Sequence, residues 1–283
     1  MKIQELTVVK ANGDHVVFSV DKLRESMRRS GADKQIIEKV IDEITPQLYE
    51  GITTKKIYQM AFNLLKKGSK STASRYKLKN ALMEIGPSGF PFERFVAELF
   101  RKKGYKTQTS IIVQGACVSH EIDVIATTES EQYMIECKFH SLAGKLTDVK
   151  VPLYIHSRFR DILATWKGNT KINKKVLSGW IVTNTRFSDD ALQYGKCADL
   201  RLLGWDYPMG KGIKDIIDEY KVYPITCLTG LTKAEKEQIL AKEIVFCGDL
   251  PKNKQLLFSI GLSEKRINGL VTEINNLHVV HSN

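Results

Sequence analysis

The sequence lacks a long apolar run, a paired-cysteine motif and a phosphate-binding loop. None of its 283 residues falls in a run approaching the roughly 18 apolar residues of a membrane span, and the N-terminus, MKIQELTVVKANGD, has no signal-peptide core. The five cysteines are scattered, odd in number and form no CxxC, which excludes a disulfide framework and a zinc ribbon. No GxxxxGK(S/T) run occurs, which argues against an ATPase motor. We therefore expect an intracellular, cytoplasmic protein with no membrane partner.

The most informative property that is present is positive charge. Lysine and arginine number 43 against 32 aspartates and glutamates, a formal net charge of +11. Such a balance favours polyanionic partners, nucleic acid first, although a merely soluble basic surface is the alternative. The length allows about two domains. The patterning predicts three segments, at 1–86, 87–222 and 223–283.

The first segment, 1–86, is predicted to be α+β. Its opening, LTVVKANGDHVVFSV, places Asn12-Gly13 between β-branched runs, which predicts a β-hairpin. Asp21 is a candidate N-cap for the helix that follows. Further helices are predicted at KQIIEKVIDEI, at KKIYQMAFNLLKKG and near TASRYKLKNALMEI, and "GPSG" then reads as a linker.

The second segment, 87–222, changes to a helix followed by strands. PFERFVAELFRKKGY is amphipathic and ends at Gly104. Strands are predicted at QTSIIVQG, EIDVIAT and YMIECKF, then a helix near VKVPLYIHSRFRDILATW and a strand at VLSGWIVTN. The pattern predicts an α/β domain, with a mixed sheet flanked by helices.

Within this segment, HEIDVIATTESEQYMIECK places charged residues inside apolar runs. A hairpin turn centred between Glu129 and Ser130 puts Asp123 opposite Glu136, with Cβ atoms about 5 Å apart. Lys138 shares that face because strand side chains alternate. Two carboxylates so close repel one another unless a cation lies between them or one is protonated. A divalent metal resolves the conflict, and would activate water against a phosphodiester while Lys138 orients that water.

Three points stay open here. The pattern also fits an ordinary cross-strand ion pair. Glu93 borders the apolar stripe of the preceding helix and could approach the same patch, or it could be a surface glutamate. His120 and Glu121 could contact the substrate or assist the metal, or could be polar residues at a strand edge.

The order of FERFVAELFRKKGY, Gly115, HEIDVIA and ECK resembles the Mrr-type restriction endonucleases of the PD-(D/E)xK nuclease superfamily. The resemblance implies that Asp123 and Glu136 hold Mg²⁺ or Mn²⁺, that Lys138 is the catalytic lysine and that Glu93 is the helix carboxylate. Ile122 stands where the superfamily's name has proline.

The helix around 149–164 places His156 and Arg160 four residues apart, on one face. They are candidates for DNA phosphate contacts beside the cleavage site, with a solvated basic face as the alternative.

The N-terminal segment resembles the ATP-cone, a nucleotide-binding regulatory module. The pattern comprises Val8, Lys10 and Gly13, then Phe18 and Lys22, then GITTKKIY and a helix with Ala73 and Tyr76. The resemblance implies that ATP or dATP binds without hydrolysis at the hairpin and the helix beside it, with Lys10 and Lys22 at the phosphates. The candidate nucleotide-binding residues are Lys10, Gly13, Lys22, Thr54 and Tyr58. Ala11 and Asn12 depart from the usual turn.

The last segment, 223–283, is predicted to be a small all-α tail. LLFSIGLSEKRINGLV faintly resembles a helix-hairpin-helix motif, but the glycine expected near Ser263 is absent, which favours packing or oligomerisation. Together the segments predict a nucleotide-regulated, Mg²⁺-dependent DNA endonuclease of restriction or DNA-processing type. The alternatives are an inactive nucleotide-sensing DNA-binding regulator and a nuclease specific for junctions or flaps. A homodimer would supply the two sites that double-strand cleavage needs.

Overall fold

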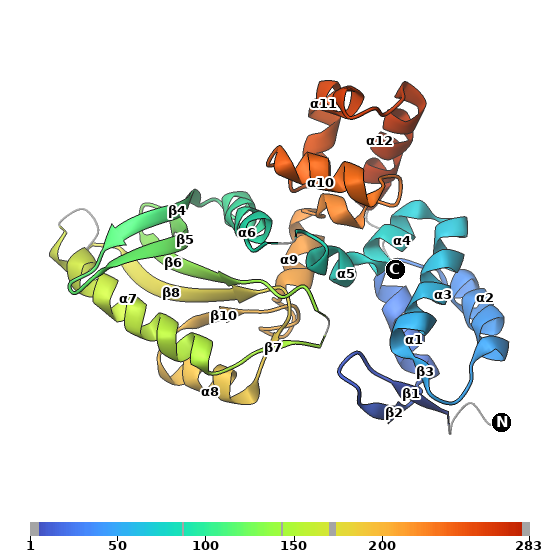
Figure 1. The fold of residues 1–283 in the computed structure, drawn as a ribbon, viewed down its shortest axis with the longest axis horizontal. Coiled ribbons are helices and arrows are strands. Elements are labelled where there is room, and N and C mark those ends of the chain that lie inside the picture. Colours follow the sequence, from blue (N-terminus) through green and yellow to red (C-terminus); the bar gives the residue numbers. More distant parts are fainter. Residues whose placement is uncertain (1–5, 87, 143, 170–173, 279–283) are drawn as a thin grey trace. The chain divides into compact units, whose positions relative to one another are not determined.

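The computed structural model describes residues 6–86, 88–142, 144–169 and 174–278. It forms two compact units (Figure 1): Leu82–Val222, and a unit that combines Met1–Ala81 with Tyr223–Asn283. The three-segment division predicted above stays a prediction. Within the described ranges, no helix is both long and apolar enough to cross a membrane.

The unit 82–222 contains the mixed sheet that the sequence predicts. Its strand order is β10-β8-β6-β5-β4, with β4, β5 and β6 antiparallel and β6, β8 and β10 parallel. A short ladder joins β7 to β9. The strands are β4 (Lys106–Gln114), β5 (Ser119–Thr127), β6 (Glu131–Lys138), β7 (Leu146–Thr147), β8 (Val176–Thr183), β9 (Arg186–Phe187) and β10 (Arg201–Leu203).

One face of this sheet is covered by α6 (Phe90–Lys102), as Figure 1 shows. The helix buries an apolar stripe that the sequence spacing predicts, and Phe100 packs edge-on against Tyr133 and Trp180 of the sheet. The stripe consists of Phe92, Phe95, Val96, Leu99 and Phe100.

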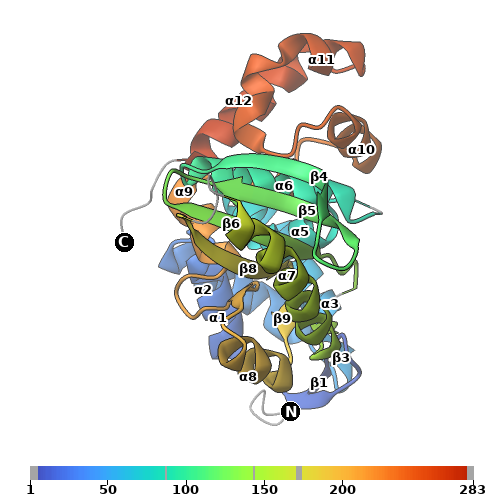
Figure 2. The same ribbon diagram turned by 90° about the vertical axis from the view of Figure 1, so that its left-hand side faces the viewer.

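The opposite face is covered by α7 (Lys150–Gly168) and α8 (Asp189–Cys197), and Figure 2 shows α7 running across the sheet. Ile155, Phe159 and Ile162 of α7 pack with Ile181 of β8 in one buried cluster. Because helices cover both faces, Tyr133–Ile135 of β6 and Ile181–Thr183 of β8 are buried, so a charged residue directly after the buried part of β6 stands out. After β10 the unit closes with α9 (Ile213–Tyr220).

The other unit begins with a three-stranded sheet of order β2-β1-β3, formed by β1 (Thr7–Val9), β2 (His15–Val17) and β3 (Ile52–Thr53). The predicted hairpin is confirmed: Val9 pairs with His15, and Gly13 takes the positive φ of 89° that the turn requires.

Four helices, α1 to α4, complete the N-terminal part of this unit, and α5 follows α4 along the chain. The helix predicted at KQIIEKVIDEI coincides with α2, whereas the one predicted near TASRYKLKNALMEI is two helices separated by Lys77. The N-cap prediction at Asp21 is wrong: Ser19 accepts the bond from the Lys22 N–H, and Asp21 lies in the first turn, where its charge favours the helix dipole. The helices are α1 (Val20–Arg29), α2 (Lys34–Ile44), α3 (Thr54–Gly68), α4 (Lys70–Tyr76) and α5 (Leu78–Met83), with a 3₁₀ turn at Thr45–Gln47.

The C-terminal segment folds against the N-terminal one. Glu273 of α12 is almost fully buried, and its carboxylate accepts hydrogen bonds from Ser74 Oγ of α4, from the N–H and hydroxyl of Thr229 and from the Gly230 N–H. A buried carboxylate satisfied in this way fixes the helix register on α4. The elements are 3₁₀ turns at Ile225–Cys227 and Cys247–Lys252, and α10 (Lys233–Ala241), α11 (Lys254–Ser259) and α12 (Glu264–His278).

Candidate active site

Asp123 lies where the strand pairing is interrupted. Regular pairing between β4 and β5 is broken at Ser110 and Asp123, and Ser110 has a φ of 52°, in the left-handed region that side chains other than glycine rarely adopt. On the other side, the β5–β6 ladder ends with Val124 opposite Ile135. Asp123 Oδ2 instead accepts a 2.7 Å bond from the Cys137 N–H. The side-chain carboxylate of Asp123 therefore accepts the hydrogen bond that a backbone carbonyl of β5 would accept if the β5–β6 ladder continued.

Glu136 and Lys138 are held by the parallel pairing of β6 with β8, opposite Ile181 and Thr183 respectively. The predicted hairpin register is confirmed for the four pairs nearest the turn, and Asp123 and Glu136 come directly after the last of them. Burial raises the pKa of Glu136 to about 7, and the charge of Asp123 adds to that rise. Lys138 is exposed. Its positive charge opposes the rise in the pKa values of Asp123 and Glu136 without cancelling it.

Glu93 reaches the same place from the first turn of α6. Burial first, and then the charges of Asp123, Glu121 and Glu136, raise the pKa of this carboxyl group to about 7. The structure thus brings together all four of the predicted catalytic residues: Glu93, Asp123, Glu136 and Lys138.

Arg158 of α7 is a site residue that the sequence reasoning missed. Its guanidinium donates a 2.8 Å bond to Glu136 Oε2 and another bond to the Glu121 carbonyl, and it lies over the Tyr154 ring. The signal that could have revealed it is the one used for Glu93: Arg158 precedes the buried Phe159, at the border of the apolar stripe of a sheet-covering helix.

The charges at this site do not balance. Three carboxylates, those of Glu121, Asp123 and Glu136, lie close enough to Glu93 for their charges to raise its pKa, whereas two cations, Lys138 and Arg158, face the cluster. Burial also raises the pKa of Asp123, against the opposing effect of its bond from Cys137. A further cation would relieve this repulsion, and a Mg²⁺ ion held by one or two carboxylates, waters and phosphate oxygens fits the donor set. Among the described residues, no group of three histidine, cysteine, aspartate or glutamate side chains is placed to hold a metal.

His120 stabilises the turn between β4 and β5. Its Nε2 lies 2.7 Å from Asp161 Oδ2, and the N–H groups of Cys117 and Val118 donate to the same carboxylate. These bonds, that of His120 first, lower the pKa of Asp161 to about 2. Gly115 is required here, since a Cβ at this position would lie 2.1 Å from Asp161 Oδ2. Glu121, by contrast, is exposed and belongs to the carboxylate cluster through its charge.

His156 and Arg160 lie on α7 one turn apart, as the sequence predicts. His156 Nδ1 shares a 2.8 Å hydrogen bond with the Tyr194 hydroxyl of α8, and Arg160 is exposed. It is Arg158, between them, that α7 presents to the carboxylates. DNA contacts by His156 and Arg160 stay a prediction.

Two of the candidate nucleotide-binding residues, Lys10 and Thr54, directly follow the ends of the paired strands β1 and β3. Val9 pairs in parallel with Thr53, which sets Lys10 beside Thr54 at the start of α3. The Lys10 ammonium lies 3.7 Å from Asp14 in an exposed ion pair, an interaction that contributes little and leaves the lysine available to an anion.

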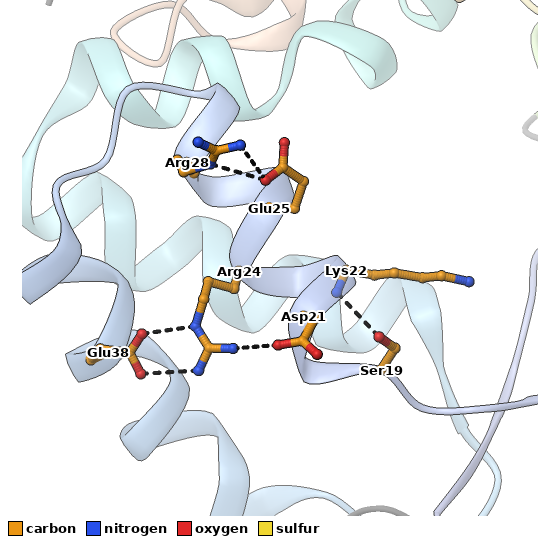
Figure 3. A network of polar contacts seen from close by, with 7 residues as sticks. All are labelled: Ser19, Asp21, Lys22, Arg24, Glu25, Arg28 and Glu38. Atoms are coloured by element: carbon orange, nitrogen blue, oxygen red, sulfur yellow. Dashed lines mark hydrogen bonds and ion pairs between the residues drawn. The ribbon is translucent and has the colours of Figure 1, made fainter. Parts of the chain in front are cut away.

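The other candidates lie on α1 and α3. Figure 3 shows the Lys22 side chain extending away from α1, whereas Arg24 joins Asp21 of the same helix to Glu38 of α2. Tyr58 lies one turn after Thr54, and its ring stacks on Tyr76 with a 5.0 Å centroid distance.

Comparisons with known proteins assign the protein class of the unit 82–222. Residues 87–206 match the family model described as Restriction endonuclease (Mrr_cat), and residues 223–278 match the one described as AF1548-like, C-terminal. The chain therefore carries an Mrr-type restriction endonuclease domain followed by an AF1548-like C-terminal domain. No ATP-cone is shown, so that resemblance stays a prediction.

A relative from Archaeoglobus fulgidus, described as an uncharacterized protein, is 37% identical over 179 residues, which are 63% of this chain and 97% of the relative. This chain belongs to the same family. The crystal structure of AF1548, described as a protein of unknown function, matches with a TM-score of 0.55 at 34% identity, over 68% of this chain and 98% of that one. The structure of Can2 from Sulfobacillus thermosulfidooxidans, in complex with cyclic tetra-adenylate, matches over 71% of this chain and 54% of that chain. Its TM-score of 0.34 and its sequence identity of 13% are too low for the match to bear on function.

Proposed function

We propose that this protein is a Mg²⁺-dependent DNA endonuclease that hydrolyses phosphodiester bonds at the cluster around Asp123. The observation that carries the proposal is the convergence of Glu93, Asp123, Glu136 and Lys138, from one helix and two strands, where the sheet pairing is interrupted. The restriction endonuclease match over 87–206 supports the reaction class. The surplus of lysine and arginine over the whole chain supports a polyanionic substrate.

Each residue has a chemical task in this proposal. Asp123 and Glu136 would hold Mg²⁺ or Mn²⁺. When bound, the metal would neutralise charge on the phosphoryl oxygens and lower the pKa of a water molecule. Lys138 positions the attacking water and stabilises negative charge on the phosphate. Glu93, with a pKa raised to about 7, is suited to accept the proton of that water near neutral pH. The new bond joins the water oxygen to phosphorus, and the bond to one bridging oxygen breaks.

Arg158 occupies Glu136 Oε2 and so competes with a metal for that oxygen. We expect the guanidinium to move to a phosphate oxygen when DNA and metal bind, because Arg pairs with phosphate as readily as with carboxylate. Arg158→Lys, which keeps the charge without the planar fork, should retain part of the activity that Arg158→Ala loses.

Nicking of supercoiled plasmid tests the nuclease. The wild-type protein should nick in Mg²⁺, and Asp123→Asn should not, while Asp189→Asn, at an exposed position on α8, serves as the control and should nick normally. DNA binding without nicking, on plain, methylated and branched DNA alike, would contradict the proposal and indicate the DNA-binding regulator. Faster cleavage of branched than of linear DNA would assign a structure-specific nuclease.

We further propose that ATP or dATP binds at Lys10 and Thr54 and regulates this activity. The parallel pairing of β1 with β3 supports a shared site, and Lys22 and Tyr58 are its further candidates. Nicking rates with and without ATP should differ for the wild-type protein, and the difference should shrink in Lys10→Gln. An ATP effect of unchanged size in that variant would refute the assignment.

A further inference from the structure

A cavity lies at the edge strand β10 of the sheet, away from the carboxylate cluster. It has a volume of about 350 Å³, within the range of about 300–1,000 Å³ typical of small-molecule sites. It is bounded by the C-terminal end of α6, by β8 and β10, and by the segment that leads into α9. All of its lining residues belong to the unit 82–222.

The cavity is separate from the active site. Glu93 lies in the first turn of α6, and Lys103, at the C-cap of the same helix, lines the cavity. Ten residues of helix separate the two, which corresponds to about 15 Å. The cavity also lies on β8 and β10, whereas Asp123 is on β5, three strands from β10. Glu136 on β6 is opposite Ile181, the chain neighbour of Trp180, but Glu136 is bonded to Arg158 of α7, whereas Trp180 packs on Phe100 of α6, on the other face of the sheet.

Four cations line this cavity: Lys103, Lys196, Arg201 and Lys211. In the part of the chain that the structure describes, none of them forms an ion pair within 4 Å, and Asp199 is the one acidic residue of the lining. Outside the lining, Glu131 is near enough for the charges of Arg201 and Lys103 to lower its pKa, so Lys196 and Lys211 carry most of the unbalanced charge. Like charges gathered around a concavity repel one another, and the concave shape concentrates their field on whatever enters. An anion relieves that repulsion, so phosphate is the group that the lining favours.

The rest of the lining is aromatic and aliphatic. Arg201 is paired with Trp180 across β10 and β8, so the two side chains leave the sheet on the same face, where the indole also packs on Phe100 and Tyr133. Tyr207 supplies a second ring, and leucines and an isoleucine the remaining surface. Flat apolar surface next to several cations is the combination that receives a base and its phosphate together.

We propose that this cavity binds a nucleoside monophosphate, either free or as the phosphorylated end of a DNA strand. Lys196, Arg201 and Lys211 contact the phosphate, and Trp180 and Tyr207 contact the base. The proposal does not depend on nuclease activity, nor on nucleotide binding at Lys10.

Tryptophan fluorescence distinguishes this cavity from the N-terminal site. The chain has three tryptophans, Trp166, Trp180 and Trp205, all within 82–222, so a nucleotide bound at Lys10 lies in a unit without a tryptophan. Titration with dAMP should change the emission of the full-length protein and saturate, and deoxyadenosine should bind at least about 10-fold more weakly because it has no phosphate.

Variants locate the response. Arg201→Gln and Lys196→Gln, both at exposed positions, should each weaken dAMP binding by about 10-fold. Lys106→Gln, on the opposite edge strand β4, is the matched control and should bind as the wild type does. A 5′-phosphorylated hexamer, compared with the same hexamer without the phosphate, distinguishes a strand end from a free nucleotide. Absence of a saturable change up to about 5 mM dAMP, or equal binding by wild type and Arg201→Gln, would overturn the proposal.

Discussion

Glu136→Gln should make the metal-free protein less sensitive to alkaline pH. The folded pKa of Glu136, about 7, lies above its ordinary value of 4.5, so the folded protein binds this proton more tightly than the unfolded chain does. The stability associated with the proton is fully present below pH 4.5 and is lost as pH rises through 7. Because a tenfold change in proton affinity corresponds to about 1.4 kcal/mol, the loss between pH 5 and pH 8 is about 2 to 3 kcal/mol.

Urea denaturation in the absence of divalent metal measures this difference. Tryptophan emission is the appropriate signal, since all three tryptophans lie in the unit that contains Glu136 and the other unit could unfold separately. Glu136→Gln mimics the protonated side chain, can still accept the bond from Arg158 and should lack the part of the loss that Glu136 contributes, leaving only the part due to Glu93, whose pKa is also raised to about 7. Glu129→Gln, at an exposed position in the turn of the same hairpin, should retain it. Equal pH dependence in wild type and Glu136→Gln would refute the description of Glu136 as a buried, destabilised carboxylate.

Three further predictions concern the scaffold. Gly115→Ala should lower the stability of the nuclease unit by about 1–3 kcal/mol in urea, since its Cβ would collide with a carboxylate of α7, whereas Gly168→Ala, with no atom within 4 Å of its Cβ, should not. Glu273→Gln should lower the stability of the unit that contains α12 by about 1–3 kcal/mol, measured by loss of helical circular dichroism. The reason is that the amide NH₂ replaces a carboxylate oxygen that accepts hydrogen bonds, and the groups around it are themselves donors. Two of the five thiols, Cys117 and Cys197, are exposed and should react rapidly with a thiol reagent in the native protein. Cys117 should be the slower of the two, because Asp161 raises the pKa of its thiol. Rapid reaction of all five thiols would contradict the burial of the other three.

Local sequence rules predicted much of the site. The register of the β5–β6 hairpin follows from the turn position and from alternation of side chains, and both are confirmed up to Val124 and Ile135. The interruption of the β4–β5 pairing next to this pair was not predictable, because it coincides with a positive φ at Ser110 of the neighbouring strand, a residue that no turn motif marks.

The residues that were missed act across elements distant in sequence. Arg158 and Glu136 are separated by 22 residues, and their contact depends on how α7 crosses the sheet. Glu273 accepts a bond from Ser74, 199 residues away, which no periodicity could reveal. The positions along each element were therefore readable from the sequence, whereas the pairing of side chains between elements required the packed structure.

The central claim is that the carboxylate cluster hydrolyses DNA through a bound divalent metal, and the nicking rate of supercoiled plasmid as a function of Mg²⁺ concentration tests it most directly. Wild type and Glu136→Gln are compared after both have been shown to be folded in the urea experiment. The account predicts a rate that rises and saturates with Mg²⁺ for wild type, and a Glu136→Gln rate at least about 100-fold lower at the same Mg²⁺ concentration. Equal rates for the two proteins, or nicking that persists without divalent metal, would contradict it.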